Sequence, residues 1–328
     1  MRRAAVDPRT DQVLDQAFSE CRRETRLHAR TFFFASHVLP PEKRAASYAV
    51  YAFCRRADNI VDLPVSATPR QELAQLRDLL DRVFESAATL ESPWLALRDT
   101  VRRFDIPISY FYDLLRGVEL DLTKSRYVDF AELHDYCYCV ASVVGLMMSR
   151  IFGVSDPAAL ERALEMGTAM QLTNILRDVG EDYRMGRVYL PHNELEAYGY
   201  TEADLAEGRI DQRFIQLMQF QIARARDYYR SAAPGIETIP DDGSRTCARL
   251  MSTAYAQILD RIEMNGYDVF RRRAFVPLSG KLRIAATVLL RRSGGATTGP
   301  VRSMECRPHD PPLSGPAKAR ETMSGEIR

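Results

Sequence analysis

The sequence predicts an all-α fold, and three observations support that prediction. Apolar residues recur every three or four positions almost throughout 11–292, as at Leu73, Leu76 and Leu80, which is the period of an amphipathic helix. Strand-like alternation and Asn-Gly hairpin signals are nearly absent. Prolines divide the chain into segments that are each long enough for one or two helices. We therefore expect a bundle of about ten helices in one domain.

Composition limits the possible functions and the domain bounds. The chain has 328 residues, of which 46% are hydrophobic, enough for a substantial core. Its formal net charge is +1, and because tracking nucleic-acid phosphates needs a surplus of Lys and Arg, no nucleic-acid partner is expected. Beyond position 292 Gly, Ser, Thr and Pro dominate, and such a segment buries too little apolar surface to offset its ordering entropy. We expect a helical domain at 11–292 and a disordered tail at 293–328.

Cysteine usage and the apolar runs indicate a cytoplasmic protein. None of the six cysteines has CxxC spacing, and the five histidines do not cluster with them, so neither a zinc site nor a disulfide framework is expected. Met1–Gln12 is charged and lacks the apolar stretch of a signal peptide. The longest apolar runs, Val140–Met148 and Ile284–Leu290, fall short of the ~20 residues of a spanning helix. The chain is expected to be soluble or to lie on a membrane surface.

The first candidate site is a pair of aspartates, Asp58 and Asp62, four residues apart in a helical segment. On a helix this spacing puts both carboxylates on one face, a turn apart, where like charges repel. A cation between them would make the arrangement tolerable, and Arg55 and Arg56 lie one turn earlier, where they could meet a phosphate. The pattern alone also fits a solvated, charged helical turn.

A second acidic stripe runs through 171–191. Offsets of 0, 3, 7 and 11 put four polar side chains on one narrow helix face: Gln171, Asn174, Asp178 and Asp182. The opposing positions are apolar, and a stripe of amides and carboxylates is costly to bury unless something binds it. An exposed polar face is the alternative, although this face carries almost no Lys to balance its charge.

Two helices that each carry an Asp-x-x-x-Asp pair could face each other across a bundle. Their hard carboxylate oxygens suit magnesium, which prefers oxygen ligands and usually bridges to substrate phosphates. A cavity walled by helices and lined with aromatic side chains would hold an apolar tail. Diphosphate at an acidic rim and hydrocarbon in a cavity together describe a prenyl diphosphate.

The sequence resembles the squalene/phytoene synthase family, and within it most closely the bacterial phytoene synthases, over about residues 20–292. The resemblance rests on the segments 30–40, 51–62, 136–145, 171–191 and 267–282. Of these, Asn174–Asp182 is the most specific. The resemblance implies an isoprenoid-synthase fold, a single-domain helical bundle around a central cavity.

The resemblance also implies roles for the matching residues. The catalytic set would be Asp58, Asp62, Asp178, Asp182 and Tyr136. The metal, magnesium or in its place manganese, would be held by Asp58, Asp62, Asn174, Asp178 and Asp182. Substrate would be bound by Thr31, Phe32, Arg55, Gln171, Asn174, Arg177, Tyr255 and Arg273. Two positions depart from the family's pattern: Asn59 stands where many relatives have a second Asp, and Ala29 where relatives often have a serine.

The implied activity is the head-to-head condensation of two geranylgeranyl diphosphates to phytoene, a prenyltransferase step of carotenoid biosynthesis that passes through a cyclopropylcarbinyl diphosphate. Aromatic rings expected to stabilise the cation are Phe32, Tyr51, Phe53, Tyr136 and Tyr138. A C15 enzyme making dehydrosqualene or squalene is the alternative. A non-enzymatic assembly factor of this fold is disfavoured, because such a protein has no reason to keep all four aspartates. No NADPH is expected, since no Gly-x-Gly-x-x-Gly follows a strand.

The segment Arg271–Arg292 suggests a membrane surface as a further partner. It mixes seven basic residues with apolar ones and contains no acid. Mixtures of this kind lie at the level of lipid headgroups, and an apolar product has to leave into lipid. A core helix with a solvated basic face is the alternative. The expected location is the cytoplasm, with peripheral attachment to the inner membrane face.

Overall fold

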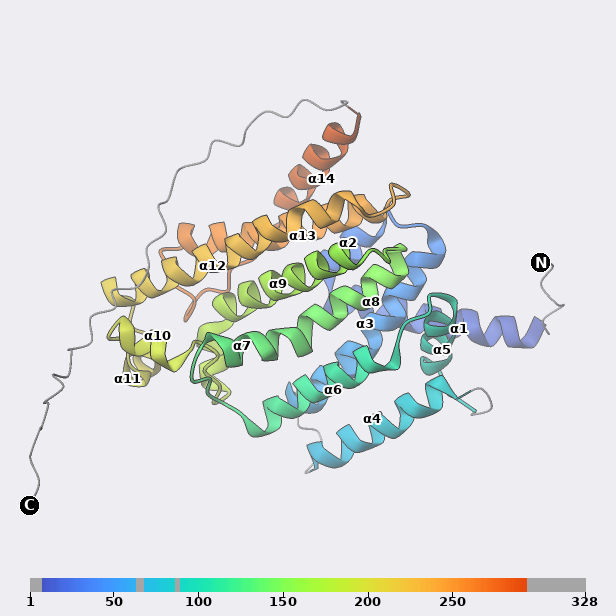
Figure 1. Ribbon diagram of the computed structural model, residues 1–328, viewed down its shortest axis with the longest axis horizontal. Helices are drawn as coiled ribbons and strands as arrows, with labels where there is room; N and C mark the ends of the chain where they lie inside the picture. Colours follow the sequence, from blue (N-terminus) through green and yellow to red (C-terminus); the bar gives the residue numbers. More distant parts are fainter. Residues whose placement is uncertain (1–7, 63–67, 86–88, 294–328) are drawn as a thin grey trace, which may run out of the picture. The chain divides into compact units, whose positions relative to one another are not determined.

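A computed structural model describes residues 8–62, 68–85 and 89–293, without the side chains at 8–11 and 291–293 (Figure 1). The tail predicted for 293–328 lies outside the described residues apart from its first position. The first half of the described chain forms α1 (Pro8–His28), α2 (Arg30–Ser36), α3 (Pro41–Asp62), α4 (Pro69–Phe84), α5 (Trp94–Arg103), α6 (Ile108–Thr123) and α7 (Phe130–Cys137). The second half forms the π-helix η1 (Tyr138–Ser142), then α8 (Val143–Phe152), α9 (Pro157–Arg184), α10 (His192–Ala197), α11 (Glu202–Glu207), α12 (Gln212–Glu237), α13 (Ser244–Met264) and α14 (Leu278–Ser293).

The all-α prediction is confirmed, but the expected number of helices was too low. The described residues contain fourteen α-helices, three of which have only six or seven residues. Helices of six or seven residues span less than two turns, which is too short for an apolar pattern to repeat, so their ends mark them instead. In α11 the ends are clear: Thr201 and Asp204 form a capping box, and Gly208 closes the helix in the left-handed conformation.

Helix α9 lies in the middle of the bundle and packs against α12, α13, α8 and η1 (Figure 1). Its apolar face is buried, with Leu172, Ile175 and Leu176 each no more than 3% exposed. Close approach to η1 depends on Gly167, because a side chain there would clash with the backbone of Ser142. The central helix is therefore fixed on several sides, and its polar stripe is fixed with it.

The π-helix η1 interrupts the path from α7 to α8 beside this central helix. Single π-helical turns are rare and often occur at functional sites. Gly117 of α6 permits the wider turn, because a Cβ there would lie 2.6 Å from Cγ1 of Val140. The insertion changes the direction in which the neighbouring side chains point.

One stretch of the described residues, Phe130–Phe152, is long and apolar enough to cross a bilayer. It comprises α7, η1 and α8, and 56% of its most apolar window is buried inside the protein. Burial against α6 and α9 is what a core helix of a globular domain shows, and length and composition alone do not separate the two cases.

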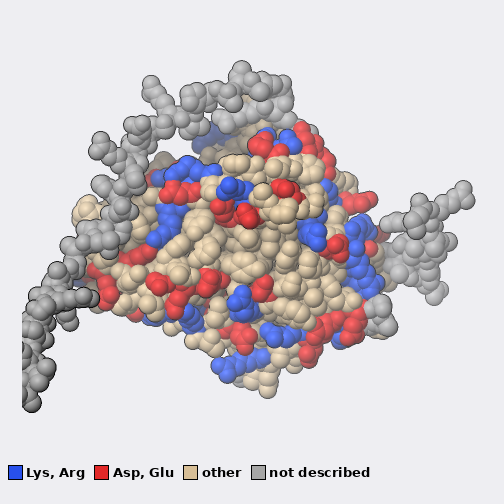
Figure 2. Space-filling view, in the orientation of Figure 1, with Lys and Arg blue, Asp and Glu red and all other residues tan. Residues whose placement is uncertain are grey.

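Charges of both signs are interspersed over the face of the described residues shown in Figure 2. The whole chain has 45 basic and 44 acidic residues. A surface of this kind lacks, on that face, the continuous basic stripe that nucleic-acid-binding proteins use.

Candidate functional site

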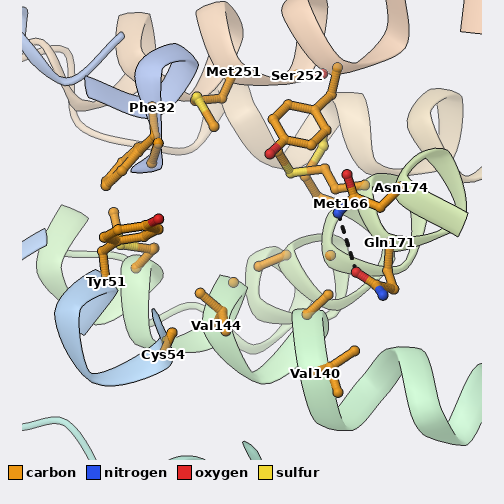
Figure 3. A pocket seen from close by; sticks show the side chains of 18 of the residues that line it. Phe32, Tyr51, Cys54, Val140, Val144, Met166, Gln171, Asn174, Met251 and Ser252 are labelled. Atoms are coloured by element: carbon orange, nitrogen blue, oxygen red, sulfur yellow. Dashed lines mark hydrogen bonds between the residues drawn. The ribbon is translucent and has the colours of Figure 1, made fainter. Parts of the chain in front are cut away.

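A cavity of about 560 Å³ lies among α3, α6, η1, α8, α9, α12 and α13, within the size range of ligand pockets. Its wall has two chemically different parts. One is acidic and comes from α3 and α9; the other is apolar and comes from side chains such as Val140, Val144, Met166 and Met251 (Figure 3). This division matches a ligand with a charged head and a hydrocarbon tail.

The acidic part contains both predicted aspartate pairs. Asp58 and Asp62 come from α3, and Asp178 and Asp182 from α9, and all four line the cavity. Gln171 and Asn174 line the same wall, and the Asn174 amide donates to Oε1 of Gln171 at 3.3 Å (Figure 3). The two sequence stripes therefore meet in one space, as the facing-helix interpretation requires.

Repulsion and desolvation act on these carboxylates. Asp58 can be reached by solvent from the cavity, yet the surrounding protein desolvates it and, with Asp62 and Asp121, raises its pKa to about 7. Desolvation, followed by the charge of Asp178, raises the pKa of Asp182 to about 8. No side-chain hydrogen bond within the described residues holds either carboxylate, so both remain open to a ligand.

Arginines neutralise the other two aspartates. Arg177 and Arg273 both bind Asp178, the latter at 3.0 Å, and Arg273 also lies 3.7 Å from Glu181. Nη1 of Arg187 lies 3.2 Å from Oδ1 of Asp62. Since Arg273 is exposed and its partner is not, this arginine can leave the carboxylate for an incoming anion without disturbing the core.

The donor set fits a hard divalent cation shared with a substrate. Within the described residues no three or more acidic, His or Cys side chains lie close enough to hold a metal by themselves. Magnesium, however, is usually held by one or two carboxylates together with substrate phosphates and water. The carboxylates of Asp58 on α3 and Asp182 on α9 offer such partial ligand sets, and a cation would offset the desolvation and the repulsion that raise their pKa values.

Three predicted substrate-binding residues do not line the cavity: Thr31, Arg55 and Arg177. Arg177 donates a hydrogen bond to Asp178, which lines the cavity. Thr31 is half-buried and adjoins Phe32, which also lines the cavity. Arg55 is near enough to Asp58 to lower the pKa of that carboxyl group, and its buried Nε has no partner among the described residues. A buried guanidinium nitrogen without a partner is costly, which makes Arg55 a candidate for contact with an anion.

The two departures from the family's pattern differ in their relation to the cavity. Ala29 lines it, where a serine would have supplied a hydroxyl. Oδ1 of Asn59 is buried and has no hydrogen-bond partner in the described residues. The amide therefore takes the space of a carboxylate without its charge.

The aromatic candidates divide into two groups. Phe32, Tyr51, Tyr136 and Tyr255 line the cavity, and the rings of Phe32 and Tyr51 are 6.1 Å apart (Figure 3). Phe53 instead packs against Phe111 in the core, and the hydroxyl of Tyr138 donates to Asp113. Neither of these two reaches the cavity, because spacing on a helix does not tell which of its faces meets the ligand.

Several polar residues of the wall were not identified from the sequence, among them Asp121, Arg187 and Tyr189. Arg187 and Tyr189 follow α9 inside the matched segment 171–191, so the resemblance pointed at them without giving them a role. Asp121 lies two residues after Glu119, near the end of α6. The available signal was its position among apolar residues, in Val118-Glu-Leu-Asp-Leu, where an unpaired carboxylate needs a partner.

Comparison with known proteins agrees with this geometry. The profile of the squalene/phytoene synthase family matches residues 25–279. A phytoene synthase from Arthrospira platensis is 41% identical over 298 residues, which is 86% of this chain and 96% of the relative. A 15-cis-phytoene synthase from Synechococcus elongatus is 42% identical over 292 residues, or 85% of this chain and 94% of the relative.

Solved structures give the same result for the fold. A dehydrosqualene synthase crystallised with a ligand superposes with a TM-score of 0.80 at 30% identity, covering 86% of this chain and 98% of that one. A squalene synthase from Alicyclobacillus acidocaldarius superposes with a TM-score of 0.72 at 29% identity, covering 77% and 95%. The predicted isoprenoid-synthase fold is confirmed.

The raised pKa values predict how pH changes the stability of the metal-free protein. A carboxyl group with a higher pKa in the folded chain binds more protons there, so stability is full below its ordinary pKa and is lost as pH rises. For Asp58 and Asp182 the loss runs from the ordinary 3.8 to about 7 and about 8. In the presence of a chelator, the melting temperature should fall between about pH 4 and pH 8.

The matched variants for this measurement are Asp182→Asn and Asp105→Asn. The first removes one of the two titrating groups and should flatten the decline, while the second changes a side chain that is 94% exposed and should leave it unchanged. A curve for Asp182→Asn as steep as that of the wild type would contradict the assignment.

Proposed function

The chain belongs to the squalene/phytoene synthase family, and from this membership and the geometry of the cavity we propose that it is a prenyltransferase that joins two geranylgeranyl diphosphates head to head to give phytoene. The observation that carries the proposal is the meeting of two aspartate pairs, from α3 and α9, at one part of a cavity that is otherwise apolar. In this reaction a cyclopropylcarbinyl diphosphate forms first and then rearranges, as a step of carotenoid biosynthesis.

The acidic wall and its arginines would bind the two diphosphates. We assign the metal to Asp58, Asp62, Asn174, Asp178 and Asp182, with magnesium as the ion and manganese as a substitute. When bound, such a cation neutralises the departing diphosphate. Arg177 and Arg273 already lie against Asp178, and Arg55 has an unpartnered nitrogen nearby. These guanidinium groups can exchange a carboxylate for a phosphate oxygen, since both accept bidentate donors.

The apolar wall would hold the chains and keep water from the cation. Phe32 and Tyr51 offer ring faces from one side, and Met166 and Met251 offer thioethers from others (Figure 3). A ring face attracts a positive charge through its quadrupole, and a closed apolar site prevents capture of the cation by water. Burial raises the pKa of Tyr136 well above its ordinary value, so its hydroxyl keeps its proton before the reaction begins.

Two considerations favour the C20 substrate without a reductant. The relatives that are 41–42% identical carry the name phytoene synthase, whereas the dehydrosqualene synthase is 30% identical. Phytoene forms by loss of a proton from the final cation, so no hydride donor is required. A C15 synthase making dehydrosqualene remains the competing function, because a few side chains in the apolar wall can change chain-length preference, each misfit methylene being worth about 1 kcal/mol.

Replacing Asp58 or Asp178 by Asn should abolish turnover while leaving helical content nearly intact. The amide keeps the shape of the side chain but loses the charge that a metal-bound diphosphate needs. Turnover with geranylgeranyl diphosphate and magnesium is the measurement, and Asp78→Asn on the exposed face of α4 is the control. If either variant keeps more than about a tenth of the wild-type rate, a loss of less than ~1.4 kcal/mol, that residue is not a metal ligand.

Competition between substrates tests the product. With equal concentrations of farnesyl and geranylgeranyl diphosphate, magnesium and no NADPH, the purified enzyme should make mainly C40 phytoene, identified by mass spectrometry. A dominant C30 product would show that the phytoene assignment is wrong, while the assignment to the family would stand. If squalene appears only after NADPH is added, the proposal that the enzyme needs no reductant is wrong as well.

The surface of residues 271–290, here called the interfacial segment, supports a proposal about location. Phe275, Leu278 and Leu290 are 68%, 66% and 71% exposed, next to the exposed Arg271, Arg272 and Arg283. The opposite face of α14 is buried through Ile284 and Val288. This two-sided helix suits an anionic bilayer, to which each basic residue near the surface contributes about 1 kcal/mol. We propose a cytoplasmic protein that attaches to the inner membrane face through this segment.

Liposome flotation tests the attachment. At low salt the protein should float with anionic vesicles more than with neutral ones, and the double variant Phe275→Ser with Leu282→Ser should reduce recovery. The control is Leu27→Ser with Val128→Ser, two exposed apolar residues elsewhere. Equal recovery with neutral and anionic lipid would contradict the electrostatic attachment. If both double variants reduce recovery equally, the interfacial segment is not the attachment site.

A further inference from the structure

Three tyrosine rings and one carboxylate form a cluster beside the acidic wall of the cavity. The ring centroids of Tyr136 and Tyr189 are 5.1 Å apart, and those of Tyr127 and Tyr189 are 5.7 Å apart, both pairs stacked. The hydroxyl of Tyr136 donates to Oδ2 of Asp121 at 2.9 Å, and that of Tyr189 donates to Oδ1 at 2.8 Å. One carboxylate thus accepts from both hydroxyls at short distance, while the other acceptor open to the Tyr136 proton, the Tyr189 oxygen, lies further away at 3.3 Å.

The arrangement fixes the direction of two hydroxyl dipoles. Because the rings are buried and stacked, the main freedom left is rotation of each O–H bond. Asp121 turns both protons toward itself, so the negative ends of the two dipoles remain for other neighbours. Asp121, Tyr136 and Tyr189 all line the cavity, whereas Tyr127 does not. The two hydroxyl oxygens lie 3.3 Å from each other, and the other neighbour that can reach them is whatever occupies the cavity.

We infer that Asp121 is a positioning residue for the second half of the proposed reaction, where it orients the Tyr136 and Tyr189 hydroxyls so that their oxygens stabilise the rearranging carbocation; this inference rests on the proposed function. In the first half the cation is attacked at once by the neighbouring double bond. In the second half the cation has to rearrange its skeleton before it is quenched, so it depends longer on fixed dipoles. Dipoles set in advance need no reorganisation when the charge develops.

The fold contains matched pairs that separate this role from a structural one. Asp113, on the same helix α6, accepts a hydrogen bond from the Tyr138 hydroxyl at 3.2 Å, but neither residue lines the cavity. The hydroxyl of Tyr127 is buried in the same ring stack and has no partner among the described residues. Asp113→Asn therefore controls for Asp121→Asn, and Tyr127→Phe controls for Tyr189→Phe.

The experiment compares product composition at equal substrate conversion. The full chain is incubated with geranylgeranyl diphosphate and magnesium, and phytoene, cyclopropylcarbinyl diphosphate and prenyl alcohols are quantified. In Asp121→Asn an amide N–H faces one of the hydroxyls, so that hydroxyl has to turn its proton away. The ratio of intermediate and alcohols to phytoene should rise at least about tenfold, equivalent to ~1.4 kcal/mol in the partitioning step. Tyr189→Phe should raise the ratio in the same direction and by less.

Purified cyclopropylcarbinyl diphosphate, supplied directly, isolates the second half. Asp121→Asn should convert it more slowly than the wild type does, while Asp113→Asn and Tyr127→Phe should match the wild type in rate and ratio. An unchanged ratio in Asp121→Asn and Tyr189→Phe, or equal changes in the controls, would overturn the inference. If Asp121→Asn fails to fold, Tyr189→Phe alone decides it. A wild type that makes no C40 product would instead overturn the proposed function.

Discussion

The rest of the structure depends on the repulsion between carboxylates that α3 and α9 hold at one part of the cavity. Arginines form ion pairs with Asp62 and Asp178. Among the described residues Asp58 and Asp182 form no ion pair; Arg55 and Arg187 only partly offset their desolvation and repulsion, and their pKa values are raised. A bare diphosphate would be repelled by this wall, and a cation alone would leave the arginines paired. A cation and a diphosphate arriving together satisfy both sets of charges, which is why the wall fits the head of a prenyl diphosphate.

Holding like charges in place requires a rigid frame, and two glycines of α9 supply close contacts for it. Gly167 lets the backbone of η1 lie against the helix. At Gly180 a Cβ would lie 2.7 Å from Cα of Phe270, so the segment after α13 also packs directly on α9. Arg273 follows three residues later and reaches Asp178 at 3.0 Å. The same close approach therefore fixes the helix and brings a guanidinium to its carboxylate.

How far the sequence could predict this site depends on whether the contacts are local. The stripe Gln171, Asn174, Asp178 and Asp182 lies on one helix, so its period alone showed that the side chains share a face, and all four line the cavity. The family resemblance brought in residues on other elements, such as Phe32 and Tyr255. Asp121 was missed because its partners lie 15 and 68 positions away, and no local pattern joins α6 to the segment after α9. The short helices were missed for a related reason, since capping rather than periodicity defines them.

The cavity wall near the N-terminal end of α9, far from the aspartates, contains an arginine, although this region would contact an apolar chain. Arg162 lines the cavity sixteen residues before Asp178, about 24 Å along the helix at 1.5 Å per residue. Its Nη1 donates to Glu165 at 2.9 Å and to Ser231 at 2.8 Å, so the charge is neutralised and the polar end is engaged. Gly235 of α12 packs on the Cβ of Arg162, where any side chain would clash. What remains for a hydrocarbon is the methylene stem of the arginine, an apolar surface. A fully extended sixteen-carbon main chain, built from C–C bonds of about 1.5 Å, is roughly 19 Å long, which is shorter than the stretch of α9 from Asp178 to Arg162, so the cavity wall along this helix accommodates a C20 chain.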